Sequence, residues 1–181
     1  MTKQILRLAA SFALATAITS AAALPASNPF RGLDRFVGTW TSSGTFSATP
    51  YSKAGTANGL TTCSWSLYGD FLICQQRVIL NGAVQHDLAI YTYDPLTHAY
   101  KFYNIGRSRA NETSISVTPT TIVYTDSFVD HGKPVTIHTL NVWNSSNRYD
   151  HYTFRTEFSR DGGKTWTRML SGTAHRLEPR P

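Results

Sequence analysis

The sequence lacks the motifs by which common enzyme classes are recognised. It contains no Gly-x-Ser-x-Gly turn of the kind that presents a hydrolase nucleophile. None of its six histidines stands in a His-x-His or His-Glu-x-x-His arrangement. We therefore predict no catalytic residues and no metal site from motifs, and enzymatic activity remains an open alternative.

The sequence also lacks a concentrated basic surface. Seventeen Lys and Arg residues against eleven acidic residues give a net charge of +6, but the basic residues are scattered along the chain. Nucleic-acid-binding proteins usually gather such residues into one stripe. We therefore expect no nucleic-acid partner.

The first residues have the pattern of a secretory signal peptide. Lys3 and Arg7 precede an apolar stretch, 8–18, and Ala21-Ala22-Ala23 fits a small-residue cleavage site. The apolar stretch is too short for a membrane-spanning helix of about 20 residues. We predict a signal peptide over 1–23 and a single periplasmic or secreted domain over 24–181, with no membrane span after cleavage.

Only two cysteines are present, and in an exported protein they most simply form one disulfide. Cys63 and Cys74 lie equidistant from Tyr68-Gly69. If these two residues form a two-residue hairpin loop, Cys63 faces Cys74 at a hydrogen-bonded site. Such a disulfide would stabilise the fold by about 2–3 kcal/mol. A redox-active pair is the alternative, but the spacing lacks the proximity of Cys-x-x-Cys.

No long segment shows helical periodicity, and strand-forming residues dominate from Phe36 onward. Turn signals such as Asn81-Gly82 and Asp94-Pro95 separate the runs. A short helical turn is expected over 29–35. The predicted strands span 36–48, 56–67, 70–80, 84–94, 98–106, 112–118, 121–130, 134–144, 148–159 and 164–176.

About ten hairpin-linked strands predict an all-β fold, an antiparallel up-and-down barrel whose closure removes the sheet edges. A two-sheet sandwich is the alternative, although it usually needs longer crossovers.

Register predicts which side chains point into this barrel. The Cys63/Cys74 hairpin places Trp65 on the inner face, and pairing through Asn81-Gly82 sets Gln76 opposite Asp87. A four-residue loop over 94–97, closed by Tyr93 and His98, then sets Asp87 opposite Asn104 and Tyr91 opposite Tyr100. We therefore predict an inward polar row of Gln76, Asp87 and Asn104 beside Tyr91 and Tyr100.

Two interpretations of the polar row remain. It is either an internal network that fixes register or the polar anchor of a ligand cavity. A one-residue slip would turn the row to solvent and bring His86, Leu88 and Ile90 inward.

The segment Phe36-Val37-Gly38-Thr39-Trp40, after a short helical turn, resembles the opening of lipocalins and related calycin barrels. The resemblance implies that Trp40 plugs the closed end and that a basic residue of the last strand, Arg168 or Arg176, packs on it. With Gly44, the Cys63/Cys74 hairpin, 86–91, 93–95 and 161–166, nearly all of the mature chain resembles an exported bacterial calycin-like family of unknown function.

Nitrobindin-like haem barrels are a more distant resemblance. They open with a Gly-x-Trp-x-Gly-x-Gly run, in which Ser42 replaces the middle glycine here. Their haem-binding histidine near the C-terminus has His175 as its positional match. The resemblance therefore implies haem as an alternative ligand, whereas the residues themselves predict no cofactor.

The fold and the inward residues together predict a monomeric or weakly dimeric binding protein for a small, mostly apolar molecule. One alternative is an enzyme acting on a hydrophobic substrate with Asp87 as general base. The other is a structural or interaction domain without a ligand. The residues expected to contact the ligand are Trp40, Trp65, Gln76, Asp87, Tyr91, Tyr100 and Asn104.

Overall fold

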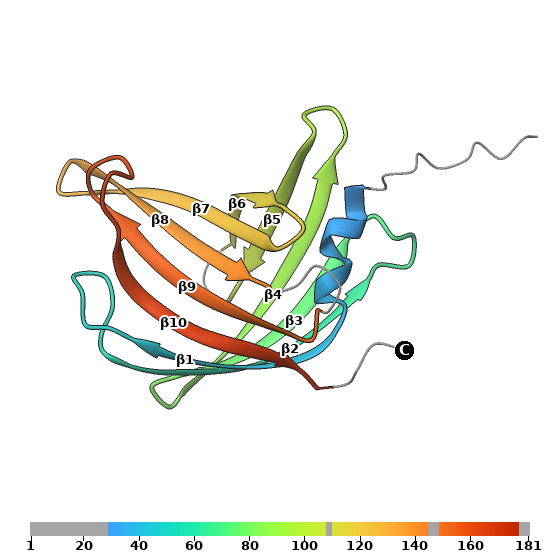
Figure 1. Ribbon diagram of the computed structural model, residues 1–181, viewed down its shortest axis with the longest axis horizontal. Coiled ribbons are helices and arrows are strands. Elements are labelled where there is room, and N and C mark those ends of the chain that lie inside the picture. The colour runs from blue at the N-terminus through green and yellow to red at the C-terminus, as the bar shows by residue number, and fades with distance from the viewer. Residues whose placement is uncertain (1–28, 108–109, 145–148, 178–181) are drawn as a thin grey trace, which may run out of the picture.

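A computed structural model of the chain describes residues 29–107, 110–144 and 149–177. The predicted signal peptide lies outside these residues. The described residues form a short 3₁₀ helix and ten antiparallel strands (Figure 1). The elements are η1 (Pro29–Phe36), β1 (Gly38–Phe46), β2 (Gly55–Trp65), β3 (Leu72–Leu80), β4 (Ala83–Asp94), β5 (Ala99–Ile105), β6 (Ala110–Val117), β7 (Thr121–Asp130), β8 (Lys133–Val142), β9 (His151–Ser159) and β10 (Thr167–Arg176).

Each strand pairs with its neighbour in sequence, and β1 pairs with β10 to close the barrel. Trp40 lies opposite Arg176 across this last junction. The predicted up-and-down barrel is thus confirmed, as is the short helical turn before the first strand. No helix among the described residues is long and apolar enough to span a bilayer.

The turn between β3 and β4 explains why the register of these two strands could be predicted from the sequence. Asn81 and Gly82 have φ values of 50° and 85°, and Leu80 pairs with Ala83 around them. Positive φ at both central residues matches a type I′ hairpin, which asparagine and glycine adopt at low cost. The predicted pairing of Gln76 with Asp87 follows and is confirmed.

The cysteine hairpin has the predicted register but a wider turn. Cys63 pairs with Cys74, and the two form a disulfide. The predicted two-residue loop is wrong, because β2 ends at Trp65, β3 begins at Leu72, and the Ser66 N–H donates to the Phe71 carbonyl at 2.8 Å. That bond makes Ser66 and Phe71 a hydrogen-bonded pair. The alternation of hydrogen-bonded and non-hydrogen-bonded pairs along the hairpin is therefore shifted by one residue from the predicted one. The cysteines therefore occupy a close, non-hydrogen-bonded site with 4.0 Å between their Cα atoms.

The β4–β5 register differs from the prediction by two residues. Asp94 pairs with Ala99, and the Asp94 carboxylate accepts hydrogen bonds from the Leu96 and Thr97 N–H groups. His98 has a φ of 52° and belongs to the loop. Consequently Asn104 faces Ala89 rather than Asp87, and Tyr91 faces Phe102 rather than Tyr100. Since side chains alternate with period two, this slip keeps every residue on its predicted face.

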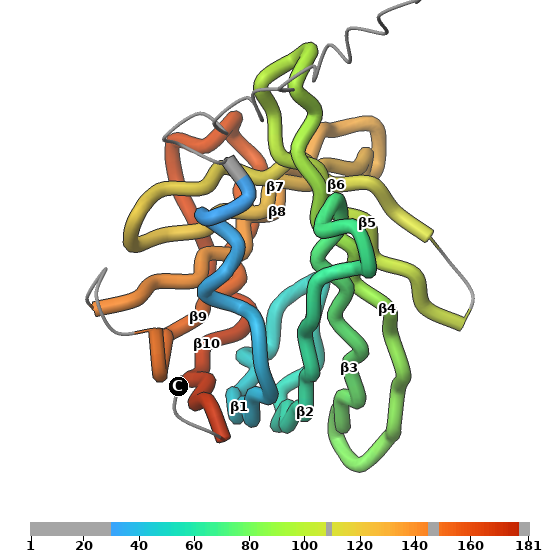
Figure 2. The backbone as a smooth tube through the Cα atoms, turned by 90° about the vertical axis from the view of Figure 1, so that its right-hand side faces the viewer, coloured from blue at the N-terminus to red at the C-terminus, as the bar shows by residue number. Residues whose placement is uncertain are grey.

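Helix η1 closes one end of the barrel. Figure 2 looks onto this end, with η1 in front of the strand ends. Leu33 is fully buried there, and Phe36 packs into the same core as Leu72 and Trp143. The helix thus acts as a plug that buries apolar side chains from inside the barrel.

At the opposite end, which we call the open end because no helix covers it among the described residues, the loop between β1 and β2 packs on the strands (Figure 1). The Tyr51 hydroxyl donates to Asp130 at 2.7 Å, and Arg160 donates to both the Tyr51 hydroxyl and Asp130. The Tyr51 ring lies edge-on to Phe128 and Phe158. These contacts fasten the loop to β7 and β9.

The barrel wall separates between β6 and β7. Their pairing covers only Ser114–Val117 against Ile122–Thr125, whereas β7 pairs with β8 along all of Thr121–Asp130. In the described residues, β7 beyond Thr125 therefore has a partner strand on one side only. We call this opening the β6–β7 seam.

Candidate ligand-binding cavity

The barrel interior contains a cavity of about 340 Å³ between the η1 plug and the open end. Side chains from η1 and nine of the strands point into it. Because strand residues alternate between faces, each strand contributes residues two apart. The lining is Phe36, Trp40, Thr61, Cys63, Cys74, Gln76, Tyr91, Phe102, Asn104, Asn111, Thr113, Tyr124, Asp126, Ile137, Thr139, Asn141 and Tyr152.

Aromatic rings form the part of the lining next to the plug, which we call the aromatic floor. Phe36 stacks on Tyr91 with 5.3 Å between ring centroids, and Phe102 lies 4.9 Å from Tyr91. On the other side, Trp40 and Tyr152 lie 5.3 Å apart. Such mutually packed rings hold one another in place and offer flat apolar surfaces to a ligand.

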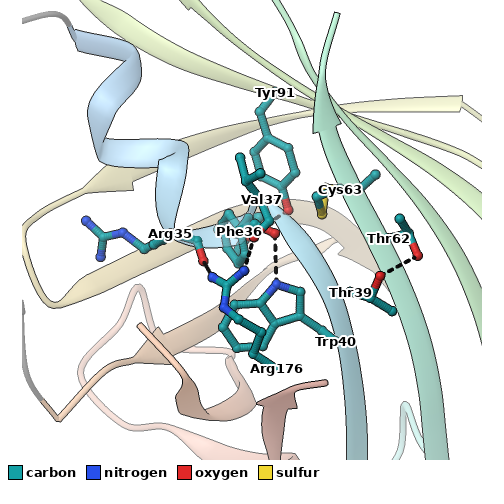
Figure 3. Close-up of a disulfide and its surroundings, with 11 residues drawn as sticks. Arg35, Phe36, Val37, Thr39, Trp40, Thr62, Cys63, Tyr91 and Arg176 are labelled. Carbon is teal, nitrogen blue, oxygen red and sulfur yellow. Dashed lines mark hydrogen bonds between the residues drawn. A yellow bond between two sulfur atoms is a disulfide. The ribbon is translucent and has the colours of Figure 1, made fainter. Parts of the chain in front are cut away.

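Arg176 fixes the floor from behind. Its guanidinium lies 4.4 Å from the Trp40 ring centroid and donates to the Arg35 and Val37 carbonyls (Figure 3). It also donates to the Tyr149 carbonyl. The Trp40 indole N–H donates to the Phe36 carbonyl at 2.8 Å. Of the two basic residues implied by the resemblance, Arg176 is therefore the one that packs on Trp40. Arg168 pairs with Glu157 instead.

Two tyrosine hydroxyls meet within the floor. The Tyr91 and Tyr124 hydroxyl oxygens lie 2.9 Å apart and share a hydrogen bond. Burial raises the pKa of both phenols, and it also raises the pKa of Tyr152. All three are therefore neutral at physiological pH and act as hydrogen-bonding groups.

Polar side chains form the rest of the lining, some of them level with the aromatic floor. Four are carboxamides (Gln76, Asn104, Asn111 and Asn141), three are threonines (Thr61, Thr113 and Thr139), and one is a carboxylate, Asp126. In the described part of the chain, the four carboxamides make no hydrogen bond to protein groups. They retain unused donors and acceptors that face the cavity.

Four of the seven predicted ligand residues line this cavity: Trp40, Gln76, Tyr91 and Asn104. Trp65 and Tyr100 lie on the inner face but under the plug. Trp65 donates to Asp34 at 2.9 Å and packs edge-on against Phe30, and Tyr100 packs against Tyr93. Helix η1 thus takes the space that sequence reasoning assigned to a ligand.

Asp87 lies nearer the open end, in a separate pocket with Asn104, Gly106 and Arg107. A Cβ at position 106 would lie 2.7 Å from an Asp87 carboxylate oxygen, so the glycine makes room for this side chain. The predicted row of Gln76, Asp87 and Asn104 is therefore broken. Gln76 faces Asp87, but Asn104 belongs one step closer to the floor.

Sequence reasoning missed the lining residues of β6 to β9. The carboxylate Asp126 and the aromatic Tyr124 lie two positions apart on β7, as do Asn111 and Thr113 on β6. This alternation is visible in the sequence. To decide which of the alternating residues face inward, however, one must know how β6 pairs with β5 across the loop between them.

His175 does not fit a haem inside this barrel. It lies on β10 next to the buried Ala174, is exposed, and stacks on His151 on the outer face. No histidine is present in the cavity lining. Among the described residues, no group of three or more His, Cys, Asp or Glu could hold a metal ion.

The structure is similar to known barrels. Rv2717c from M. tuberculosis matches with a TM-score of 0.56 and 14% identity, over 84% of this chain and 99% of that one. The S-type phycobiliprotein lyase CPES from Guillardia theta matches with a TM-score of 0.55 and 11% identity, over 86% and 96%. No protein-family model and no curated protein matches the sequence. These likenesses confirm the predicted calycin-like fold.

Proposed function

We propose that this protein binds one small molecule in the barrel cavity. The observation that carries the proposal is a preformed space of about 340 Å³ with an aromatic floor and unused carboxamides around it. Concave sites that combine aromatic surfaces with placed polar groups are typical of small-molecule sites, and this cavity has a larger polar share than most. The calycin-like fold is compatible with such a role.

The lining supports an amphipathic ligand rather than a wholly apolar one. A flat apolar or aromatic part would stack on Phe36, Trp40 and Tyr91. Hydrogen-bonding groups would meet Gln76, Asn104 and Asn111, because leaving these carboxamides desolvated without partners would reduce affinity. A fully apolar molecule would bury them at that cost.

The enzyme alternative has less support at Asp87. Asp87 is absent from the cavity lining, so a substrate on the aromatic floor would not present a proton within hydrogen-bond reach of it. The carboxylate that does line the cavity is Asp126. We therefore favour binding over catalysis by Asp87.

We also infer that the protein acts outside the cytoplasm as a monomer or weak dimer. The Cys63–Cys74 disulfide is of the kind that persists in oxidising compartments. The mass of the protein recovered from its own cells tests this inference. A chain beginning at Leu24 with an oxidised pair supports export, whereas an unprocessed, reduced chain contradicts it.

Filling the cavity tests the binding proposal. Thr61 lines the cavity, whereas Thr62 is exposed on the outer face of the same strand. Titration with the neutral fluorescent probe 1-aminoanthracene should give saturable 1:1 binding. Thr61→Trp should weaken it by about tenfold or more, because the indole occupies the ligand space, and Thr62→Trp should leave it unchanged. Equal effects of both substitutions would place the dye outside the cavity.

A further inference from the structure

Among the residues that the structure describes, the cavity lining has one charged side chain, and it is negative. Asp126 is the only Asp, Glu, Lys, Arg or His among these described lining residues, although the whole chain carries a net charge of +6. Two arginines lie behind the floor: Arg35, which is buried, and Arg176, which is half-buried. Arg35 donates to the Gly32 and Thr118 carbonyls, and Arg176 donates to the Arg35 carbonyl (Figure 3 shows the bond of Arg176); none of these acceptors belongs to the cavity lining.

Asp126 has no cationic partner among the described residues. One of its carboxylate oxygens accepts the Ser127 N–H at 2.7 Å, and no described Lys, Arg or His pairs with it. The neighbouring pocket at the open end is lined by an acidic residue, Asp87, and a basic residue, Arg107. Asp126 is exposed at the edge of the cavity, so water screens its charge, but no described cation compensates it.

The position of Asp126 relates this charge to the aromatic floor. It follows Thr125, the last β7 residue paired with β6, so its side chain stands where the β6–β7 seam begins. Tyr124, two residues earlier on the same face, lies 4.9 Å from Phe102. Aromatic faces attract cations, and a carboxylate beside them strengthens the attraction.

We infer that the ligand is an organic cation, a protonated amine attached to an apolar ring. The ring occupies the aromatic floor, the ammonium group pairs with Asp126, and the carboxamides accept its remaining N–H groups. Carboxylates and phosphates are disfavoured, because the described lining residues include no cation to receive them and Asp126 repels them. This inference rests on the proposed function of the cavity.

A purely structural role for Asp126 is the competing explanation. A charge near the free edge of β7 would discourage pairing with another chain. In that case the substitution of Asp126 would alter self-association and leave the affinity of small molecules unchanged. The two roles therefore differ in a measurable way.

A series of matched probes tests the inference. 2-Phenylethylamine, 2-phenylethanol and 3-phenylpropionate share a ring and differ in charge, and NMR titration at low salt measures their affinities up to millimolar dissociation constants. The amine should bind severalfold tighter than the alcohol, because Asp126 is exposed and an ion pair with it is worth about 1 kcal/mol or less, and the carboxylate should bind most weakly. The Asp126→Asn substitution should lower the affinity for the amine to that for the alcohol. The matched control, Asp87→Asn, should leave the affinities for both the amine and the alcohol unchanged.

Three outcomes would overturn the inference. The first is equal or tighter binding of the alcohol or the carboxylate, and the second is unchanged amine affinity in Asp126→Asn. The third is binding of 1-aminoanthracene with no binding of the series, which leaves the proposed function intact. If neither the dye nor the series binds, the proposed function fails as well.

Discussion

Arg176 connects segments that lie far apart in the sequence. Its guanidinium contacts the Trp40 ring of β1 and donates to carbonyls at the end of η1 and before β9. Charged hydrogen bonds of this kind are among the stronger ones, and removing the donor leaves the carbonyls without partners. Arg176 therefore joins η1, β1 and the segment before β9 at the closed end, in addition to the apolar packing of the plug.

Arg176→Ala should lower the free energy of unfolding by about 2–4 kcal/mol, with Arg176→Lys intermediate because it keeps the charge but not the planar fork. Arg168→Ala is the matched control. Its side chain is 57% exposed and pairs with Glu157 at 3.5 Å, so the loss should be about 0.5 kcal/mol or less. Urea denaturation measures both, and equal losses would contradict the role of Arg176.

The buried tyrosines predict a loss of stability at high pH. Burial raises the pKa of Tyr91, Tyr124 and Tyr152 above the ordinary value of 10.0, so the folded state holds these protons longer than the unfolded state. Their contribution is therefore fully present below pH 10 and decreases above it. Each such tyrosine should cost about 1.4 kcal/mol per pH unit beyond that point.

Tyr91→Phe tests this assignment. Denaturant unfolding between pH 8 and 10.5 should show a shallower decline for the variant, which has one fewer buried phenol to ionise. Tyr68→Phe is the control, since Tyr68 is 84% exposed and its removal should leave the wild-type slope. A decline in Tyr91→Phe as steep as in the wild type would show that other groups control the pH dependence.

At the scale of elements, the turns determined how far the strand register could be predicted from the sequence. Asn81-Gly82 needs positive φ at two successive residues, which restricts the hairpin to one register. Asp94-Pro95 is compatible with loops of several lengths. The hydrogen bonds of the Asp94 side chain stabilise a loop in which the β4–β5 register is displaced by two residues from the predicted one. Strand existence and face could therefore be predicted, but partner residues beyond β4 could not.

Helix η1 is the element whose packing most affects the cavity. Its expected presence is confirmed, but its depth in the barrel follows from side-chain packing that no local pattern encodes. Leu33 is fully buried against the strand ends. This depth is why Trp65 and Tyr100 belong to the plug rather than to the ligand site.

Leu33→Ala should therefore destabilise the fold by about 2–5 kcal/mol through lost burial and a new void. Leu67→Ala removes the same atoms from a turn where the side chain is 89% exposed, and it should change stability by about 0.5 kcal/mol or less. Thermal unfolding monitored by circular dichroism compares the two. Similar midpoints would mean that the plug contributes little.

At the scale of the whole molecule, closure of the barrel follows from the sequence, whereas its hollow interior does not. Ten hairpin-linked strands leave few alternatives to a barrel. The interior is wide enough for a ligand because it combines rings such as Phe36 and Tyr152 with shorter side chains such as Thr61 and Asn104. That balance depends on which residues meet across the barrel, and therefore on the registers of all ten strands.

The binding proposal is tested most directly by native mass spectrometry of the wild-type protein and Thr61→Trp, both purified without denaturation from the cells that naturally produce the protein. The wild type should carry one small-molecule adduct that disappears on denaturation, and Thr61→Trp should be bare. A bare wild-type protein, or the same adduct on both proteins, would contradict a ligand held in the barrel cavity.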